Sequence, residues 1–374
     1  MATLAPVRSP APPPPDRRSA APLRHLGPNW YATVMGTAIV ANAGAALPGH
    51  PSWLRTPCVL VWALSAAMLA AVLTARAGHW LRHADRAREH LLDPAVAPFY
   101  GCLSMALLAV GAGTLSVGAE VIGTPAAVAV DAVLWVAGTA SGLLIAAAIP
   151  YLMVARHQIT PGSASPVWLL PVVAPMVSAA TGPALVPHLP NGQWRAAMLL
   201  GCYAMFGLSL LATLVILPVV FARLTYGGPL PLALTPTLFL VLGPLGQSTT
   251  AVGNIADAAP GLGQASYAHL TGGFAVLYGV PVTGFALLWT ALAAAMVVRA
   301  ARRGMPFAMT WWAFTFPVGT CVTGAASLAR HTGADVLGWL AVGLYVLLVA
   351  AWATAALRTV RGLVSGALLA APRR

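Results

Sequence analysis

Residues 237–254 read TLFLVLGPLGQSTTAVGN, an apolar stretch that contains a Gly-Pro pair and ends in neutral polar side chains. It belongs to a set of ten apolar stretches, each long enough to cross ~30 Å of hydrocarbon as a helix of ~20 residues. Strands of a membrane barrel would alternate apolar and polar residues, and these stretches do not, so helices are expected. The ten expected spans are 29–47, 53–75, 98–118, 126–154, 166–187, 194–222, 231–254, 269–299, 307–328 and 335–357.

The composition indicates that most of the protein surface faces lipid. Of the 374 residues, 59% are hydrophobic and only 7% are charged, and the mean hydropathy is +0.81. A soluble domain carries roughly 25% charged residues because water must solvate its surface. The sequence therefore predicts an all-α integral membrane protein.

The distribution of arginine predicts the orientation in the membrane. The formal net charge is +12, and all 20 basic residues are arginine. Seventeen of them fall in alternate connections or in the two tails, and only Arg55, Arg195 and Arg330 fall on the other side. Cytoplasmic loops carry such an excess. Both termini are therefore expected in the cytoplasm, with an even number of spans in the plasma membrane. Because the arginines follow the topology and do not cluster on a polar domain, the net charge does not indicate nucleic-acid binding.

The chain divides into three parts by composition. Residues 1–26 are rich in proline and arginine and are expected to form a disordered cytoplasmic tail. Residues 27–360 contain the ten expected spans and form one transmembrane domain. Residues 361–374 are expected to form a short basic cytoplasmic tail.

Segment 76–97 is the only sizeable polar connection, and a short amphipathic helix on the cytoplasmic surface is expected there. It contains His79, His83 and His90, but no carboxylate or cysteine cluster completes a metal site. The four cysteines lie in separate apolar stretches and form no CxxC pair, so they are read as packing residues. No metal or cofactor is expected.

The first, third, fifth, seventh and ninth spans resemble one another, with glycine or proline near the middle and small residues after it. Examples are NWYATVMGTAIVANAGAA (29–46), WLLPVVAPMVSAATGPA (168–184) and WWAFTFPVGTCVTGAAS (311–327). Breaks of this kind are tolerated in a membrane where neighbouring helices or a water-filled cavity satisfy the freed backbone groups. The pattern favours five helical hairpins whose odd members surround a central pore, although small residues also simply allow close packing.

The odd spans contain no Asp, Glu, Arg or His at mid-membrane depth, and their polar side chains, such as Gln247, are neutral. Cation and proton pathways usually need intramembrane carboxylates or histidines. The deepest acid, Asp131, lies near the outer end of an even span and is read as an interfacial or interhelical group. A path without carboxylates suits an anion, although neutral pores also pass uncharged solutes. The sequence shows no constellation typical of an enzyme active site.

Three segments carry a resemblance to a known family. GPNWYATVMGTAIVA (27–41), GPLGQ (243–247) and WWAFTFPVG (311–319) resemble the first, seventh and ninth helices of the tellurite-resistance/dicarboxylate transporter family. That family includes plant slow-type anion channels, fungal malate permeases and sulfite efflux pumps. The resemblance extends from about residue 26 to residue 360.

The resemblance implies a ten-helix fold of five hairpins around a central pore, often assembled as a homotrimer with one pore in each subunit. It also implies that a phenylalanine on the ninth helix plugs the pore. That role falls on Phe316, which precedes Pro317, with Phe314 as the fallback. The residues expected to line the pore are Gly36, Thr37, Pro175, Gly243, Pro244, Gln247 and Pro317.

The main hypothesis is passage of small inorganic or organic anions through a pore that a phenylalanine gates. An alternative is a proton-linked carrier of C4-dicarboxylates or of sulfite- or tellurite-type oxyanions. A hypothesis of another class is a membrane sensor or scaffold that binds partners through segment 76–97. No nucleic-acid partner is expected.

Overall fold

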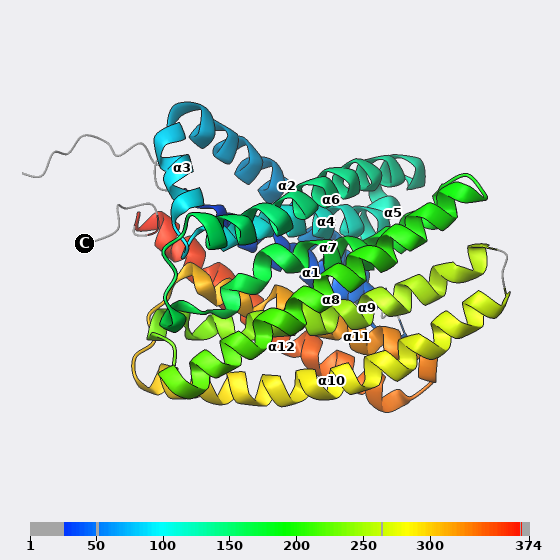
Figure 1. Ribbon diagram of the computed structural model, residues 1–374. Helices are drawn as coiled ribbons and strands as arrows, with labels where there is room; N and C mark the ends of the chain where they lie inside the picture. The colour runs from blue at the N-terminus through cyan, green and yellow to red at the C-terminus, as the bar shows by residue number, and fades with distance from the viewer. Residues whose placement is uncertain (1–25, 50–51, 263–264, 367, 369–374) are drawn as a thin grey trace, which may run out of the picture.

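The computed structural model describes residues 26–49, 52–262, 265–366 and 368, and every regular element among them is helical (Figure 1). Nearly all of the tail expected at 1–26 lies outside the described residues. The α-helices are α1 (Tyr31–Ala46), α2 (Ser52–Arg82), α3 (Ala84–Leu92), α4 (Gly101–Gly113), α5 (Ala119–Ile122), α6 (Thr124–Ala155), α7 (Leu169–Thr181), α8 (Gln193–Gly227), α9 (Leu242–Ala258), α10 (Ala265–Arg302), α11 (Phe316–Thr332) and α12 (Asp335–Val364).

Seven stretches in the described part are long and apolar enough to cross a membrane. Five of them are single long helices, namely α2, α6, α8, α10 and α12, and the other two are 97–122, around α4, and 166–188, around α7. The three remaining expected spans correspond to α1, α9 and α11, which are shorter helices of 16, 17 and 17 residues. An all-helical membrane fold is therefore confirmed.

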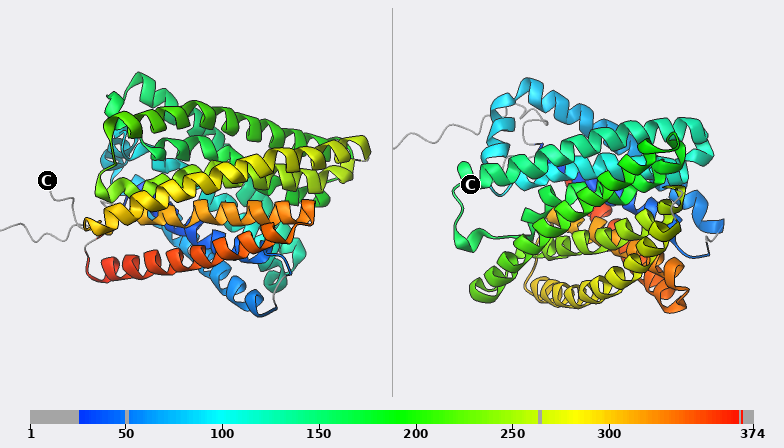
Figure 2. Two further views of the ribbon diagram at one scale, coloured as in Figure 1. Left: turned by 90° about the horizontal axis from the view of Figure 1, so that it is seen from below. Right: turned by 45° about the vertical axis from the view of Figure 1, so that its right-hand side comes forward.

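Burial separates these helices into two groups. In the five long helices, between 17% and 28% of the most apolar window is buried, whereas the values for 97–122 and 166–188 are 72% and 89%. Large apolar side chains such as Leu144, Leu277 and Trp339 are exposed on the long helices. A soluble protein rarely leaves so much apolar surface in water. The long helices, which form the outside of the bundle in Figures 1 and 2, therefore face lipid.

The shorter helices pack against one another in the interior. Helix α1 contacts α4, α4 contacts α7, α7 contacts α9, α9 contacts α11, and α11 contacts α1. These contacts close a ring of five buried helices. Each ring helix also packs along the long helix that follows it in the chain, as α1 does on α2 and α9 does on α10.

Each ring helix is preceded by a short 3₁₀ segment, and these are Pro28–Trp30, Ala97–Tyr100, Pro166–Trp168, Leu232–Val241 and Met309–Phe314. Proline occupies the first turn of three of them. The first turn of a helix tolerates proline because its N–H would have no intrahelical partner there. The five segments also contact their neighbours in ring order, from the first to the last. The ring helices therefore all begin at the same end of the molecule.

Small residues allow the ring helices to approach closely. A Cβ on Gly101 would lie 2.3 Å from the backbone oxygen of Leu170, between α4 and α7. A Cβ on Gly246 would lie 2.5 Å from the backbone nitrogen of Cys321, between α9 and α11. Only glycine fits at these two positions, so close packing explains part of the small-residue pattern.

Two expectations about helix ends need correction. In the eighth expected span (269–299), Gly272, Gly273 and Pro281 are expected to bend or break the helix. The helix is not broken, because α10 continues through all three. The first residues of segment 76–97 do not form a loop, because α2 continues as far as Arg82. The short amphipathic helix expected there is present as α3, which follows directly.

The contact of Gly246 with the backbone of α11 gives a test of the ring packing. Gly246→Ala should destabilise the protein by about 1–3 kcal/mol, because the new methyl group meets backbone atoms that cannot move away independently. Gly207→Ala on α8 is the matched control, since a Cβ there meets nothing within 4 Å. Thermal unfolding in detergent would measure both variants. Equal melting temperatures would contradict the packing described here.

Candidate permeation path

A cavity of about 850 Å³ opens where the five ring segments begin. It is lined by residues from the start of each of them, including Asn29, Phe99, Trp168, Leu234 and Met309. Because all five ring segments contribute to its wall, this cavity is the candidate entrance to a path along the ring axis. We call it the mouth cavity.

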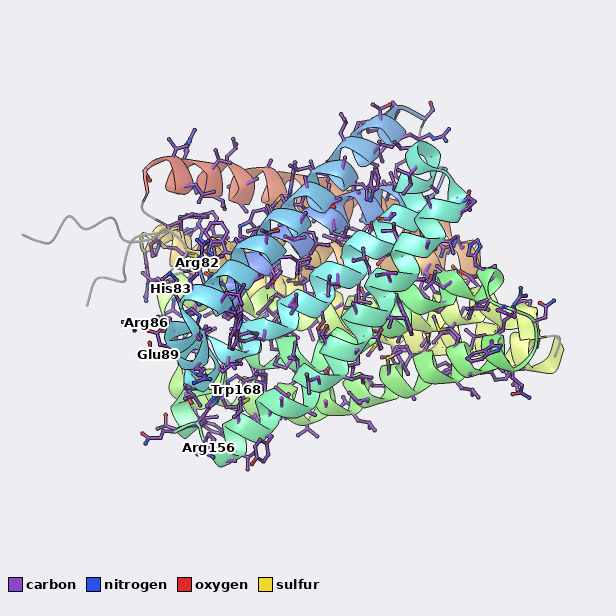
Figure 3. The ribbon with its side chains drawn as sticks, turned by 90° about the horizontal axis from the view of Figure 1, so that it is seen from above. Arg82, His83, Arg86, Glu89, Arg156 and Trp168 are labelled. Atoms are coloured by element: carbon purple, nitrogen blue, oxygen red, sulfur yellow. The ribbon has the colours of Figure 1, made fainter. Side chains whose placement is uncertain are left out.

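The mouth cavity lies at the arginine-rich end of the molecule. Helices α2, α6, α8, α10 and α12 all end there, and so does the described part of the C-terminus (Figure 1). Figure 3 shows Arg82, Arg86 and Arg156 at this end together with Trp168, one of the lining residues. The segregation of arginine expected from the sequence therefore appears in space.

Deeper in the ring, one face of α9 adjoins free space. Gly243 is buried, yet a Cβ on it would meet no atom within 4 Å. Gln247 lies four residues later, on the same face of the helix. Its side chain is only 4% exposed, and its Oε1 atom is enclosed without a hydrogen-bond partner. A buried amide oxygen without a partner is unusual in a packed interior. This face of α9, with the space beside Gly243, is therefore the candidate lining of a path inside the ring.

The helical geometry is interrupted at Thr315, immediately before Phe316. The 3₁₀ segment ends at Phe314, Thr315 has φ −97° and ψ −78°, and α11 then begins at Phe316 with Pro317 in its first turn. The 3₁₀ segment that leads into α9 instead continues into the helix without an interruption, with Pro244 in the first turn after Val241. Pro244 and Pro317 therefore start helices and do not kink them in the middle.

The two candidate gate residues have different surroundings. The ring of Phe314 is engaged by Phe239, edge to face at 5.1 Å between centroids, and by Trp311 at 5.9 Å. Phe316 is 2% exposed and lies within the buried interior at the start of α11. Phe314 is thus held in an aromatic cluster near the mouth cavity, whereas Phe316 lies farther along the ring helix.

Two residues expected to line the path on α1 contact neighbouring helices. A Cβ on Gly36 would lie 2.2 Å from Thr315 Oγ1, so Gly36 accommodates the break before α11. The hydroxyl of Thr37 donates to Thr33 O at 2.8 Å and accepts from Trp352 Nε1 of α12 at 3.1 Å. That bond directs the Thr37 hydroxyl toward the outer helices.

Pro175 is buried within α7. Side chains of neighbouring helices donate hydrogen bonds to the backbone of α7. Asn254 of α9 donates to Ala180 O at 2.8 Å, and Trp135 of α6 donates to Ser178 O at 3.1 Å. Asn42 of α1 likewise donates to Ala109 O of α4 at 2.9 Å. These bonds fix the ring helices at the end away from the mouth cavity.

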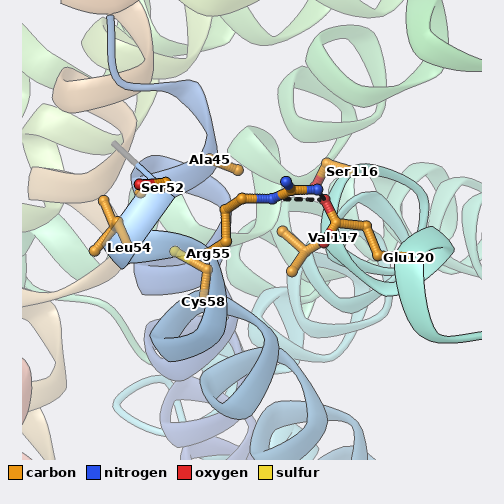
Figure 4. A pocket seen from close by; sticks show the side chains of 9 residues that line it. Ala45, Ser52, Leu54, Arg55, Cys58, Ser116, Val117 and Glu120 are labelled. Atoms are coloured by element: carbon orange, nitrogen blue, oxygen red, sulfur yellow. Dashed lines mark hydrogen bonds and ion pairs between the residues drawn. The ribbon is translucent and has the colours of Figure 1, made fainter. Parts of the chain in front are cut away.

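The arginines at the far end are all engaged. Arg55 forms an ion pair with Glu120 at 2.5 Å, beside a cavity of about 420 Å³ (Figure 4). Arg330 lies 3.4 Å from Asp257. Arg195 donates to the carbonyl oxygens of Leu189 and Pro187, both at 3.0 Å. Acidic partners therefore partly neutralise the charges of Arg55 and Arg330, and the guanidinium of Arg195 is hydrogen-bonded to the backbone.

The junction of α2 and α3 is held by a buried arginine. Arg76 donates to Leu26 O at 2.5 Å and to Tyr100 Oη at 3.2 Å, and it is 3% exposed. Nearby, the rings of His79 and His90 are stacked, with centroids 5.4 Å apart. Burial, with smaller contributions from Arg76 and His79, lowers the pKa of His90. This cluster ties the start of α1 to α3 and lies beside the ring.

Asp131 of α6 lies between helices, as expected. It is 1% exposed, and a Cβ on Gly111 of α4 would lie 2.5 Å from its Oδ1. It comes from a long outer helix and contacts a ring helix from the side. No ring helix has a carboxylate before its last turns, where Asp257 of α9 lies.

Arg223 of α8 is the only charged side chain among the described residues that line the mouth cavity. The expected span 194–222 ends one residue before Arg223 and so places it in the following connection, whereas α8 continues to Gly227. The Gly227-Gly228-Pro229 sequence that ends the helix was the available signal, because it turns the chain back over this arginine.

These features define a class of protein. A shell of lipid-facing helices surrounds a ring of buried helices that contains unfilled volume, an unpaired amide and a mouth cavity. A polytopic membrane channel or transporter has this construction.

The chain belongs to the SLAC1 family of voltage-dependent anion channels, whose family model matches residues 25–360. This match confirms the resemblance that the three quoted segments carry. The fold and the comparison together make the protein an anion channel or transporter of the membrane. The family consists of channels and transporters and not of enzymes.

Similar proteins include two uncharacterized transporters of Methanocaldococcus jannaschii. The chain is 26% identical to one of them over 92% of its own length and 95% of the relative, and 24% identical to the other over 92% and 97%. It is also 27% identical to a sulfite efflux pump of Arthroderma otae, over 88% of each chain. The likeness therefore spans whole proteins.

Gly243 allows a test that separates packing from passage. Gly243→Ala should leave the melting temperature nearly unchanged, because a Cβ there meets no atom within 4 Å, and Gly243→Leu should place a larger side chain in the same free space. We expect anion flux into liposomes to fall severalfold. Gly201→Leu on the outer helix α8, where a Cβ also meets nothing, is the control. Flux equal to that of the control would place the free space beside Gly243 outside the path.

Proposed function

We propose that all ten helical segments cross the membrane as five hairpins and that the buried ring encloses a conduit for small anions. The observation that carries this proposal is the mouth cavity, to which all five ring segments contribute residues. The proposed lining comprises Gly243, Pro244 and Gln247 of α9, Pro175 of α7 and Pro317 of α11. Gly36 and Thr37 of α1 belong to the proposed lining through the backbone of α1, because their side-chain positions face Thr315 and Trp352. The absence of ionised side chains at mid-depth in the ring helices supports an anion as the solute.

In this proposal Phe316 closes the conduit. Phe316 is the first residue of α11, directly after the interruption at Thr315. Helix α11 packs against both α1 and α9, so the Phe316 side chain lies where these three ring helices meet. An aromatic ring in a path lined by small residues closes it by steric exclusion and by dewetting. Phe314 remains the alternative, but Phe239 and Trp311 already engage its ring.

Phe316→Ala should increase anion conductance at least severalfold, because the smaller side chain leaves the narrow section open. Phe314→Ala is the matched control, and we expect it to lower stability through lost aromatic contacts without raising conductance. Whole-cell or liposome recordings, together with thermal unfolding of each variant, would measure both effects. Unchanged current in a well-folded Phe316→Ala protein would remove the gate role from this residue.

The substrate class is proposed to include oxyanions. The support is the relative named as a sulfite efflux pump, which matches the chain over most of its length. A proton-linked carrier of sulfite, of tellurite-type oxyanions or of C4-dicarboxylates is the second candidate. Flux of chloride, nitrate, sulfite and malate, measured with and without a pH gradient, separates the two. Saturable flux that follows the gradient favours the carrier, and current that reverses at the anion equilibrium potential favours the channel.

The proposed setting is the plasma membrane, with both termini in the cytoplasm and the mouth cavity facing the cytoplasm. The arginines at the ends of α2, α6, α8, α10 and α12 support this orientation. We further propose a homotrimer in which each subunit has its own conduit, with residues 27–360 as the transmembrane domain. Purified protein without any anion flux would favour the sensor or scaffold hypothesis.

A further inference from the structure

We infer that Arg223 is an anion-binding residue of the mouth cavity and that its ligand is a small oxyanion. This inference rests on the proposed conduit and adds the site at which an anion first binds. The cavity has residues of all five ring segments in its wall, and among the described residues Arg223 is the only charged side chain that lines it. An anion that enters the ring from this end therefore meets the guanidinium of Arg223.

The guanidinium of Arg223 is fixed by the backbone. Its Nε donates to Gly162 O at 3.2 Å, and its Nη1 donates to Gly228 O at 2.5 Å. Gly228 has φ +72°, a conformation that favours glycine and places its carbonyl on the arginine. Two different connections, one after α6 and one after α8, therefore hold the group in place and reduce the entropy lost when a ligand binds.

The charge of Arg223 remains uncompensated. Carbonyl oxygens accept its hydrogen bonds but carry no net charge, and no carboxylate forms an ion pair with it in the described part of the chain. The acid closest to the lining residues in sequence is Asp93, whose Oδ1 instead accepts from the backbone N–H of Ala95 at 2.8 Å. This distinguishes Arg223 from Arg55 and Arg330 at the far end, each of which has an acidic partner.

The remaining donors of Arg223 define the ligand. Its Nη2 group makes no hydrogen bond among the described residues and carries two N–H donors. Two of the lining hydroxyls are already engaged, because Ser163 donates to Thr160 O and Thr310 donates to Ala233 O, whereas the hydroxyl of Ser165 accepts from the backbone N–H of Val167 and keeps a donor for a ligand. A planar guanidinium matches a ligand with two or more oxygens better than a spherical halide. Sulfite, nitrate and small carboxylates fit this description.

The test compares Arg223→Gln with Arg156→Gln. Arg156 is an exposed arginine at the same end, and it does not line the cavity. In inside-out patches, Arg223→Gln should raise the half-saturating concentration of nitrate or sulfite roughly five- to tenfold, as expected for loss of one charge-assisted donor group. The maximal current should change less, and the preference for nitrate over chloride should decrease. Arg156→Gln should behave as the unsubstituted protein.

A second variant separates charge from geometry. Arg223→Lys keeps the positive charge and a donor to the carbonyl oxygens, but it loses the planar group. We expect it to restore most of the affinity for chloride and little of the preference for nitrate over chloride. It also tests folding, because Arg223→Gln removes two hydrogen bonds to the backbone.

A binding measurement completes the design without transport. Nitrate should raise the melting temperature of the unsubstituted protein and of Arg156→Gln in detergent, but not that of Arg223→Gln, at constant ionic strength. Equal half-saturation and equal thermal shifts for both glutamine variants would overturn this inference and leave the conduit intact. Absence of anion current from the unsubstituted protein would instead overturn the proposed function.

Discussion

The rest of this structure depends on the hydrogen bonding of five backbone segments buried away from water. Each ring helix is interrupted or preceded by proline, glycine or a 3₁₀ segment, so some carbonyl groups lack intrahelical partners. In a membrane each such group costs several kcal/mol unless another donor reaches it. Trp289 and Thr310 provide donors across helix boundaries to Leu238 O and Ala233 O, which lie in the 3₁₀ segment before α9. At the opposite end of the ring, Asn42 and Asn254 donate to Ala109 O and Ala180 O. The breaks are therefore stable only inside a ring of neighbours, and the ring in turn exists because the long helices shield it from lipid.

The sequence predicted the parts of this arrangement that follow from length, apolarity and charge. The five long helices, the stretches around α4 and α7, and the segregation of arginine each leave a signal within a single segment. The recurrence of glycine and proline in alternate spans also identified the helices that turn out to be buried. Helices α1, α9 and α11 were harder to delimit, because the 3₁₀ segments before them are as apolar as the helices themselves.

The roles of individual side chains could not be read from the sequence, because they depend on how neighbouring helices are rotated. The Thr37 hydroxyl bonds to Trp352, 315 positions away, and no local pattern announces that contact. Gly36 and Gly243 look alike in sequence, yet a Cβ on Gly36 would collide with Thr315 whereas a Cβ on Gly243 would meet nothing. Arg223 was assigned to a surface connection, since only the packed structure brings the connections after α6 and α8 onto the same cavity.

Under the proposed function, the distribution of charge along the ring separates selection of the anion from its movement. The Arg223 guanidinium lies at the mouth cavity, where water is abundant and the cost of partial desolvation is small. Deeper in the ring a full positive charge would hold the ion too tightly, and conduction requires binding that is weak enough to release it. The ring helices carry no ionised side chain at mid-depth, and a neutral amide such as that of Gln247 holds an anion more weakly than a second arginine would. The fixed charge of the proposed conduit therefore lies where the anion enters, and the interior of the ring is left without it.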